Sequence, residues 1–209
     1  MNSALRTCGY GRRLRHLPII SSAKAQLELG PMIVAYADPP YIGQAAKHYA
    51  GQPDYAGEVD HAALILRLVA EFPDGWALSC TSNSLRYLLP LCPSEVRVGA
   101  WVKPFHAYKR GIRPAYAWEP VIYLGGRNKN HPPPPKGGKA TTPKDFVSAN
   151  ITLQRGLVGA KPEKFCFWLF DLLGLGYGDT LVDLYPGTGA VTEAWERWLQ
   201  WQIPLPLAA

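Results

Sequence analysis

The stretch that decides the fold of this chain reads Met32-Ile33-Val34-Ala35-Tyr36-Ala37-Asp38-Pro39-Pro40-Tyr41. A short apolar run such as 32–37, bounded by a turn signal, is typical of a buried strand. The two prolines predict a stiff turn directly after it. In an open α/β sheet, ligands bind beyond the carboxyl ends of the strands. We therefore take residues 38–41 as candidate site residues.

The chemistry of these four residues suits a flat ligand that carries an amino group. The Asp38 carboxylate offers only hydrogen-bond acceptors. Pro39 keeps its carbonyl acceptor but has no N–H, and it presents that carbonyl on a rigid turn. Tyr41 offers a ring face for stacking. Two acceptors and a ring match an exocyclic amino group on a heterocycle, although the same residues could be no more than a strand and a turn.

Alternating strands and helices follow this stretch. We predict helices at 59–72, 82–89 (capped by Ser82), 162–173 and 190–201, and further strands at 76–80, 95–102, 119–124 and 180–184. Strands that alternate with helices predict an α/β fold in which a mostly parallel sheet is covered by helices on both faces. We find no internal repeat.

Composition limits the class of protein. A chain of 209 residues is long enough for one domain with a substantial core. No apolar run reaches the roughly 18 residues that a membrane span needs, so we expect no membrane partner. The four cysteines form no C-x-x-C pair, which predicts reduced thiols, no metal site and a cytoplasmic location.

Positive charge is concentrated in one part of the chain. The net charge is +6, and residues 103–144 contain nine Lys and Arg against one acid, Glu119, whereas the rest has 13 against 15. Clustered positive charge predicts a polyanion partner, although a solvated loop is the alternative. The candidate nucleic-acid-binding residues are Lys103, Lys109, Arg110, Arg113, Arg127, Lys129, Lys136, Lys139 and Lys144.

Two segments have unusual compositions. Residues 1–26 hold five Lys and Arg and no acid. This composition is compatible with a mitochondrial presequence, but Gly9, Gly11 and Pro18 would interrupt its helix. We therefore predict an irregular basic N-terminal arm. Residues 125–150 are rich in Pro, Gly and Lys, which predicts an extended basic loop.

A second constellation lies near the end of the chain, at Asp183-Leu184-Tyr185-Pro186-Gly187-Thr188-Gly189. It reads as a strand, a glycine turn and the start of a helix, and glycines let a ligand approach the backbone closely. Thr192 stands where a dinucleotide fingerprint needs its third glycine, and the Gly-Lys-Ser/Thr ending of a phosphate loop is missing. NAD and ATP are therefore poor candidates, and a tight structural turn is the plain alternative.

Together, D-P-P-Y and D-x-[FY]-x-G-x-G resemble the S-adenosylmethionine-dependent amino methyltransferases of DNA, in the permuted order of the beta group. Three further segments are similar to that family over residues 32–198: Trp101-Val102-Lys103-Pro104, Trp118-Glu119-Pro120-Val121-Ile122 and Lys161-Pro162-Glu163-Lys164-Phe165. The resemblance implies a Rossmann-like methyltransferase fold, with residues 27–209 as a single catalytic domain and 125–150 as its DNA-recognition loop.

The resemblance also implies roles for single residues. The reaction would be methyl transfer to the N6 amino group of adenine in DNA. The catalytic residues would be Asp38, Pro39, Pro40 and Tyr41. The residues that bind S-adenosylmethionine would be Asp183, Tyr185, Gly187, Thr188, Gly189, Lys161 and Phe165. We expect a monomer or homodimer of phage or bacterial origin, with DNA as its partner.

The chain departs from the family pattern at two places. Trp118 stands where the family usually has histidine. The family also continues past the glycine turn into a strand whose terminal acid holds the cofactor ribose, whereas residues 202–207 here include two prolines, which disfavour a central strand. We therefore expect a sheet truncated at the 180–184 strand, with that edge covered by the N-terminal arm or a partner subunit.

Other interpretations of the sequence stay open. The acceptor could be the N4 amino group of cytosine, or a base in RNA. A catalytically impaired nucleic-acid-binding homologue is an alternative from another class. A methyltransferase acting on proteins or small molecules would leave the basic loop unexplained.

Overall fold

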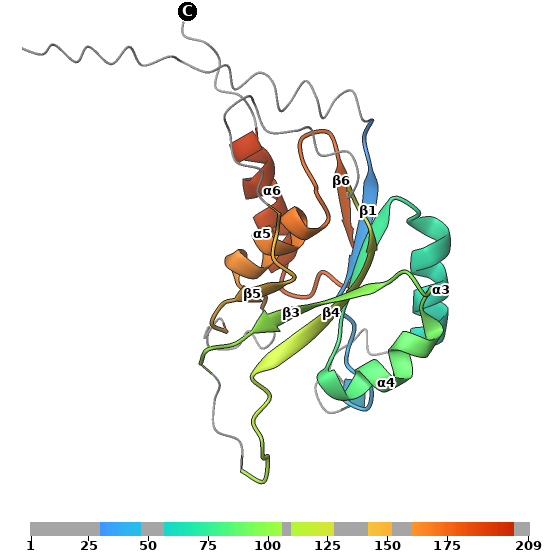
Figure 1. Ribbon diagram of the computed structural model, residues 1–209, viewed down its shortest axis with the longest axis vertical. Helices are drawn as coiled ribbons and strands as arrows, with labels where there is room; N and C mark the ends of the chain where they lie inside the picture. Colours follow the sequence, from blue (N-terminus) through green and yellow to red (C-terminus); the bar gives the residue numbers. More distant parts are fainter. Residues whose placement is uncertain (1–29, 47–56, 106–109, 128–141, 152–159, 203–209) are drawn as a thin grey trace, which may run out of the picture.

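The computed structural model describes residues 30–46, 57–105, 110–127, 142–151 and 160–202 (Figure 1). The predicted N-terminal arm lies outside these residues. The strands are β1 (Ile33–Ala37), β2 (Gly75–Ser79), β3 (Arg97–Val102), β4 (Trp118–Gly125), β5 (Phe146–Ser148) and β6 (Thr180–Asp183). The helices are α3 (His61–Glu71), α4 (Leu85–Leu88), α5 (Glu163–Leu172) and α6 (Ala190–Gln202), with 3₁₀ turns η1 (Ser82–Ser84) and η2 (Leu89–Leu91) on either side of α4.

The strands form one six-stranded sheet in the order β5-β3-β4-β2-β1-β6. β1 pairs in parallel with both β2 and β6, and β3 pairs in parallel with β5. β4 runs antiparallel to its two neighbours, β2 and β3. The prediction of a mostly parallel sheet is therefore confirmed, and β1, β2, β3 and β6 end at one common edge, which we call the carboxyl edge.

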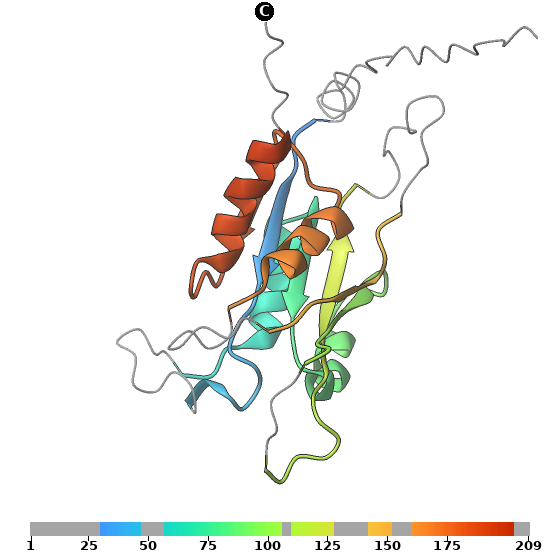
Figure 2. The ribbon, with the colours of Figure 1, turned by 90° about the vertical axis from the view of Figure 1, so that its left-hand side faces the viewer.

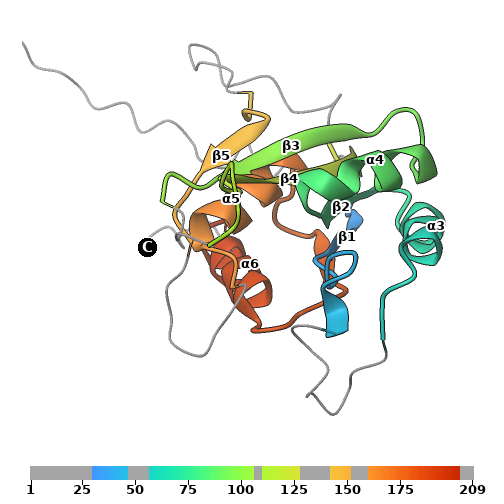
Figure 3. The ribbon, with the colours of Figure 1, turned by 90° about the horizontal axis from the view of Figure 1, so that it is seen from below.

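Residues on β1 alternate between two hydrophobic cores, one on each face of the sheet. Val34 and Tyr36 pack in the core built with α5 and α6, whereas Ala35 and Ala37 pack in the core built with α3. Figure 2 shows α5 and α6 in front of the sheet, and Figure 3 shows α3 on the opposite face. A strand covered on both faces must be apolar throughout, which explains the continuous apolar run before Asp38.

Helix α3 lies within the predicted range 59–72 and begins at His61, after its N-cap Asp60. The Asp60 side chain accepts a hydrogen bond from the Ala63 amide at 3.0 Å, which satisfies one of the unpaired donors of the first turn. Leu64, Ile65 and Leu68 are the buried residues of the helix. None of the helices in the described ranges is long and apolar enough to cross a membrane.

Two local predictions were wrong. Ser82 does not cap a helix, because the chain first makes the 3₁₀ turn η1 after Thr81 and reaches α4 only at Leu85. Strand β5 lies inside the 125–150 segment that was predicted to be a loop. Three residues are too few to show a periodicity, and β5 exists because β3 pairs with it and because the Trp101 indole donates to the Ala149 carbonyl at 2.8 Å.

A buried ion pair links several segments at the other end of the strands, where β1 and β6 begin. The Arg127 guanidinium binds both carboxylate oxygens of Asp179 and donates to the Gly30 carbonyl at 2.7 Å. Asp179 also accepts from the amides of Met32 and Gly176, each at 2.9 Å. The side chains of Arg127 and Asp179 are only 6% and 0% exposed. A guanidinium enclosed in this way is not available to a phosphate, which corrects the prediction that Arg127 binds nucleic acid.

Replacing Asp179 by alanine should destabilise the fold strongly, because it leaves the Arg127 charge buried without its partner. Removing one member of a buried pair typically lowers the free energy of unfolding by about 3–5 kcal/mol. Urea titration followed by circular dichroism measures this change. The matched control is Arg67→Ala, which breaks the exposed pair between Arg67 and Glu71 and should cost about 0.3–0.5 kcal/mol. Equal losses of unfolding free energy in the two variants would contradict a stabilising role for the Arg127–Asp179 pair.

Candidate functional site

Two acidic residues from opposite ends of the chain meet at the carboxyl edge. Asp38 directly follows β1, and Asp183 is the last residue of β6. The two strands are paired in parallel, with Tyr36 opposite Asp183, and the Leu184 amide donates to the Tyr36 carbonyl at 2.9 Å. The D-P-P-Y stretch and the glycine turn therefore leave the same end of the sheet from two neighbouring strands.

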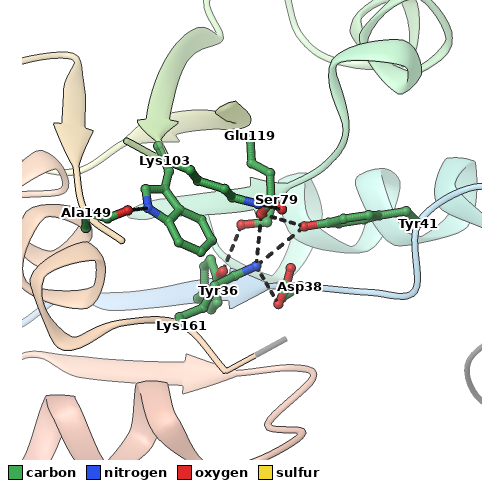
Figure 4. A network of polar contacts seen from close by, with 9 residues as sticks. Tyr36, Asp38, Tyr41, Ser79, Lys103, Glu119, Ala149 and Lys161 are labelled. Carbon is green, nitrogen blue, oxygen red and sulfur yellow. Dashed lines mark hydrogen bonds and ion pairs between the residues drawn. The ribbon is translucent and has the colours of Figure 1, made fainter. Parts of the chain in front are cut away.

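A buried lysine lies at the centre of the polar contacts beside Asp38 (Figure 4). The Lys161 ammonium is 2.9 Å from Asp38 Oδ2, 3.5 Å from Glu119 Oε2 and 3.4 Å from the Tyr41 hydroxyl. The Lys161 side chain is 5% exposed. A charge removed from water in this way needs such partners. Lys161 immediately precedes α5, whose N-cap is Pro162, so the helix start fixes where the lysine enters the site.

Glu119 joins the same group from the start of β4. It accepts from the Tyr41 hydroxyl at 3.0 Å and from the Lys103 ammonium. Lys103 follows β3, and the β3–β4 register places Trp101 opposite Glu119. Asp38, Tyr41, Lys103, Glu119 and Lys161 thus form one connected cluster, which we call the Lys161 network. Its members come from four segments that the sequence resemblance had picked out separately.

The side chains of Lys103 and Phe165 contact other parts of the protein rather than the ligands predicted for them. Lys103 was predicted to contact nucleic acid, but its ammonium is paired with Glu119 and its side chain is only 12% exposed. Phe165 was predicted to contact the cofactor, but it is fully buried. Its ring centroid is 5.3 Å from that of Trp101, and the Lys161 ammonium lies 5.5 and 5.8 Å from the Trp101 and Phe165 rings. These two rings therefore form the apolar wall behind Lys161.

The charges of the network set its protonation states. Burial raises the pKa of Asp38, and Lys161 opposes this effect only in part. Burial also acts to raise the pKa of Glu119, but Lys161 and Lys103 together leave it below its ordinary value. Burial would lower the pKa of Lys161, but Asp38, Tyr36 and Glu119 raise it above its usual range. Lys161 is therefore a cation at neutral pH and cannot act as a base, whereas Asp38 is the carboxylate that takes up a proton more readily.

The Asp183 side chain carries an unsatisfied acceptor. Its Oδ1 accepts from the Tyr185 amide at 3.2 Å, whereas its Oδ2 is buried and makes no hydrogen bond to any residue that the structure describes. Burial raises the pKa of Asp183 and the Asp38 charge raises it further, whereas the Tyr185 amide and the nearby Thr192 hydroxyl act to lower it. A buried acceptor without a donor marks a place where a ligand donor can bind.

The glycine turn beside Asp183 is open on its outer side. Gly187 and Gly189 have φ angles of 49° and 78°, a backbone conformation that favours glycine. A Cβ atom built on Gly187 would meet nothing closer than the Tyr185 carbonyl at 3.9 Å, and one on Gly189 would meet nothing within 4 Å. Thr188 between them is exposed. The turn therefore offers its backbone to a ligand, with room for that ligand.

The remaining predicted residues are found in different surroundings. Pro39 is buried and Pro40 is half-buried in the turn after β1. Arg110, Arg113 and Lys144 are exposed. Lys109, Lys129, Lys136 and Lys139 lie outside the described residues. Within the described ranges, no cluster of His, Cys, Asp or Glu could hold a metal ion.

Glu119 was not among the predicted site residues. The sequence nevertheless contained a signal, because Glu119 is the one acid among the nine Lys and Arg of residues 103–144. A lone carboxylate in a basic segment is a natural partner for buried ammonium groups. The structure shows two such groups, Lys103 and Lys161, at its oxygens.

The fold of the chain is similar to the folds of two solved structures. One is the M1.HpyAVI–SAM complex, with a TM-score of 0.52, 15% sequence identity, and coverage of 88% of this chain and 87% of that chain. The other is the cytosine-N4-specific PvuII DNA methyltransferase, with a TM-score of 0.50, 17% identity, and coverage of 83% and 75%. This chain has the methyltransferase fold. No protein-family model and no curated protein matches the sequence.

The predicted fold class is confirmed by these similarities together with the mixed six-stranded sheet. Among the described residues, β6 pairs only with β1 and forms the last strand of the sheet. β6 is therefore an edge strand of the sheet within the described ranges. The glycine turn lies at this edge, directly after β6.

Replacing Lys161 by methionine should raise the pKa of Asp38 further, because the substitution removes the cation that favours the Asp38 carboxylate and leaves the burial that disfavours it. Asp38 would then ionise only at higher pH than in the wild-type protein. Carboxyl ¹³C NMR titration of aspartate-labelled protein measures this shift. Lys164→Met, which neutralises an exposed lysine three positions along, is the control. An Asp38 titration that is the same in both variants would contradict the pairing.

Proposed function

We propose that this chain is an S-adenosylmethionine-dependent DNA methyltransferase that methylates an exocyclic amino group, with the N6 of adenine as the acceptor. The observation that carries the proposal is that Asp38 follows β1 and Asp183 ends β6, two paired parallel strands, so that the proposed acceptor site and the proposed cofactor site would adjoin. The fold shared with the M1.HpyAVI–SAM complex and with the PvuII DNA methyltransferase supports it. A cytoplasmic location and a monomeric or homodimeric state stay predictions.

The residues around the glycine turn fit the proposed cofactor. Bound S-adenosylmethionine would supply an electrophilic methyl group on a positively charged sulfur. The buried Asp183 Oδ2, which lacks a donor among the described residues, would accept from its ammonium group. The open backbone at Gly187 and Gly189 would allow the close approach that side chains prevent. The Tyr185 ring, beside Asp183, would face positive charge favourably.

The residues after β1 fit the amino group of a base. The lone pair of such an amine is delocalised into the ring, which makes it a weak nucleophile. The Asp38 carboxylate and the Pro39 carbonyl would accept its two N–H groups and favour a pyramidal nitrogen. Preset acceptors of this kind stabilise the transition state more than the ground state. The hydrogen bond from Tyr41 to Glu119 fixes the Tyr41 ring for stacking on an extruded base.

The Lys161 network would supply the charge balance for this step. Lys161 acts to lower the pKa of Asp38 and so favours its carboxylate, the form that can act as an acceptor. The amino nitrogen gains a methyl group and gives up a proton, and Asp38 would be the nearest group able to take it. Glu119, which is paired with Lys103 and Lys161, would keep these partners during the step. Glu119 therefore holds Lys161 in place when the base engages Asp38.

The experiment that tests the function is methylation of unmodified DNA, followed by nucleoside mass spectrometry. N6-methyladenine is the expected product. N4-methylcytosine is the second candidate, favoured by the similarity to the PvuII DNA methyltransferase. Methylation of RNA alone would change the acceptor class. Nucleic-acid binding without any methylation or cofactor binding would favour the impaired homologue and overturn the proposal.

Substitutions of the two acids should separate chemistry from cofactor binding. Asp38→Ala should lower kcat about 10²–10³-fold, the usual effect of removing one such contact, and leave S-adenosylmethionine affinity nearly unchanged. Asp183→Asn should instead weaken cofactor binding, because the amide bears no charge. Isothermal titration and methylation kinetics on both variants measure these effects. If the two variants had the same profile, the division of roles would be wrong.

Binding to DNA should weaken steeply with salt, because the basic segment would contact phosphates and release counterions. Each phosphate contact contributes about −0.9 to the slope of log K against log salt concentration. Replacing Lys129, Lys136 and Lys139 by glutamine should therefore reduce this slope by roughly one unit for each of these lysines that binds a phosphate. Fluorescence anisotropy over a salt series measures it. A flat salt response of the wild-type protein would reject phosphate binding by this segment.

A further inference from the structure

Large apolar side chains gather on the described part of the connection between β3 and β4. Phe105, Ile112, Tyr116 and Trp118 are all exposed, between 39% and 54%. Figure 2 shows residues 110–117 extending beyond the carboxyl edge of the sheet. A group of exposed aromatic and aliphatic side chains on a projecting segment is a common sign of a binding surface.

This segment forms a groove with η1. The groove has a volume of about 450 Å³, within the range of ligand sites, and it is lined by Ser82, Asn83, Gly111, Ile112, Arg113, Pro114, Ala115, Tyr116 and Trp118. The Asn83 amide donates to the Tyr116 hydroxyl at 3.0 Å, which ties the projecting segment to η1. The groove therefore has aromatic walls held by a direct contact.

The groove lies at the same end of β4 as the Lys161 network, on the opposite face of the sheet. Trp118 and Glu119 are consecutive residues at the start of β4, and consecutive side chains of a strand point to opposite faces. Glu119 points to Lys161, on the face covered by α5, whereas Trp118 lines the groove on the η1 side. A polymer whose target base reaches Asp38 would therefore pass the groove with a neighbouring unit.

The charge of the groove indicates what it can bind. Its lining contains one cation, Arg113, and no acid. Arg110, three residues before it in the same exposed segment, adds a second positive charge. Neither arginine forms an ion pair with a residue that the structure describes. Flat rings beside unpaired guanidinium groups suit a planar, negatively charged unit, which is the chemistry of a nucleotide.

We propose that this groove binds a nucleotide that flanks the target base, with Trp118 and Tyr116 stacking on the base and Arg113 contacting a phosphate. The proposal rests on the proposed function, since it places a second unit of the same nucleic acid. It also gives a role to Trp118, the residue at which the chain departs from the family pattern. Asn83, at the groove wall, faces the edge of the bound base.

The test compares two fluorescent single-stranded 12-mers at one salt concentration, one of thymidines and one of abasic sites. Neither probe carries an amino group, so neither engages Asp38 as an acceptor does. Wild-type protein should bind the thymidine probe more tightly. Trp118→Ala should weaken that binding about fivefold to a hundredfold, the range for one stacked base, with little effect on the abasic probe. Trp118→Phe should restore most of the preference.

The control is Trp201→Ala, which removes an exposed ring on α6 and should change neither affinity. Tyr116→Ala is the second variant if Trp118→Ala fails to fold, as judged by circular dichroism. Equal binding of the two probes by wild-type protein would overturn the proposal that the groove binds a nucleotide. An unchanged preference for the thymidine probe in both variants would overturn it as well. This test can be distinguished from the test of the proposed function. If the wild-type protein methylates DNA but shows no preference for the thymidine probe, only nucleotide binding in the groove is rejected. If it shows the preference but does not methylate, only the proposed methyltransferase activity is rejected.

Discussion

The site depends on one interaction, the contact of the buried Lys161 ammonium with two carboxylates. Asp38 comes from the end of β1 and Glu119 from the start of β4, and both acids lie within 3.5 Å of Lys161. The charge of Glu119 acts to raise the pKa of Asp38, and the Lys161 cation opposes this effect. Because Lys161 lies just before α5, the position of that helix on the sheet and the charge state of Asp38 are coupled.

The two ends of the strands differ in how completely their polar groups are hydrogen-bonded. At the amino ends of β1 and β6, Arg127 and Asp179 satisfy each other and several backbone groups. At the carboxyl edge, Asp38 is partly exposed and Asp183 retains an acceptor without a donor among the described residues. Polar groups that are fully hydrogen-bonded are typical of a structural contact. A buried acceptor without a donor is typical of a place where a ligand completes the hydrogen bonds.

Most of the fold could be predicted from local patterns. The apolar run of β1, the periodicity of α3 and the glycine turn before α6 each appeared at the expected place. Strand β5 could not be predicted, because three residues carry no period and its partner β3 is distant in the sequence. For the same reason Glu119 was passed over, since its importance lies in contacts with Tyr41 and Lys161, which come from other parts of the chain.

The sequence by itself determined which functional groups follow the strands. These are an acid and two prolines after one strand, and an acid and a glycine turn after another, with an excess of positive charge between them. Tertiary structure alone decided which cation serves which acid. Lys103, Arg127 and Lys161 are all positive, yet the first two proved to be partners of Glu119 and Asp179 rather than free groups for a phosphate. Charge can be read from a residue type, but desolvation and pairing arise only when distant segments pack together.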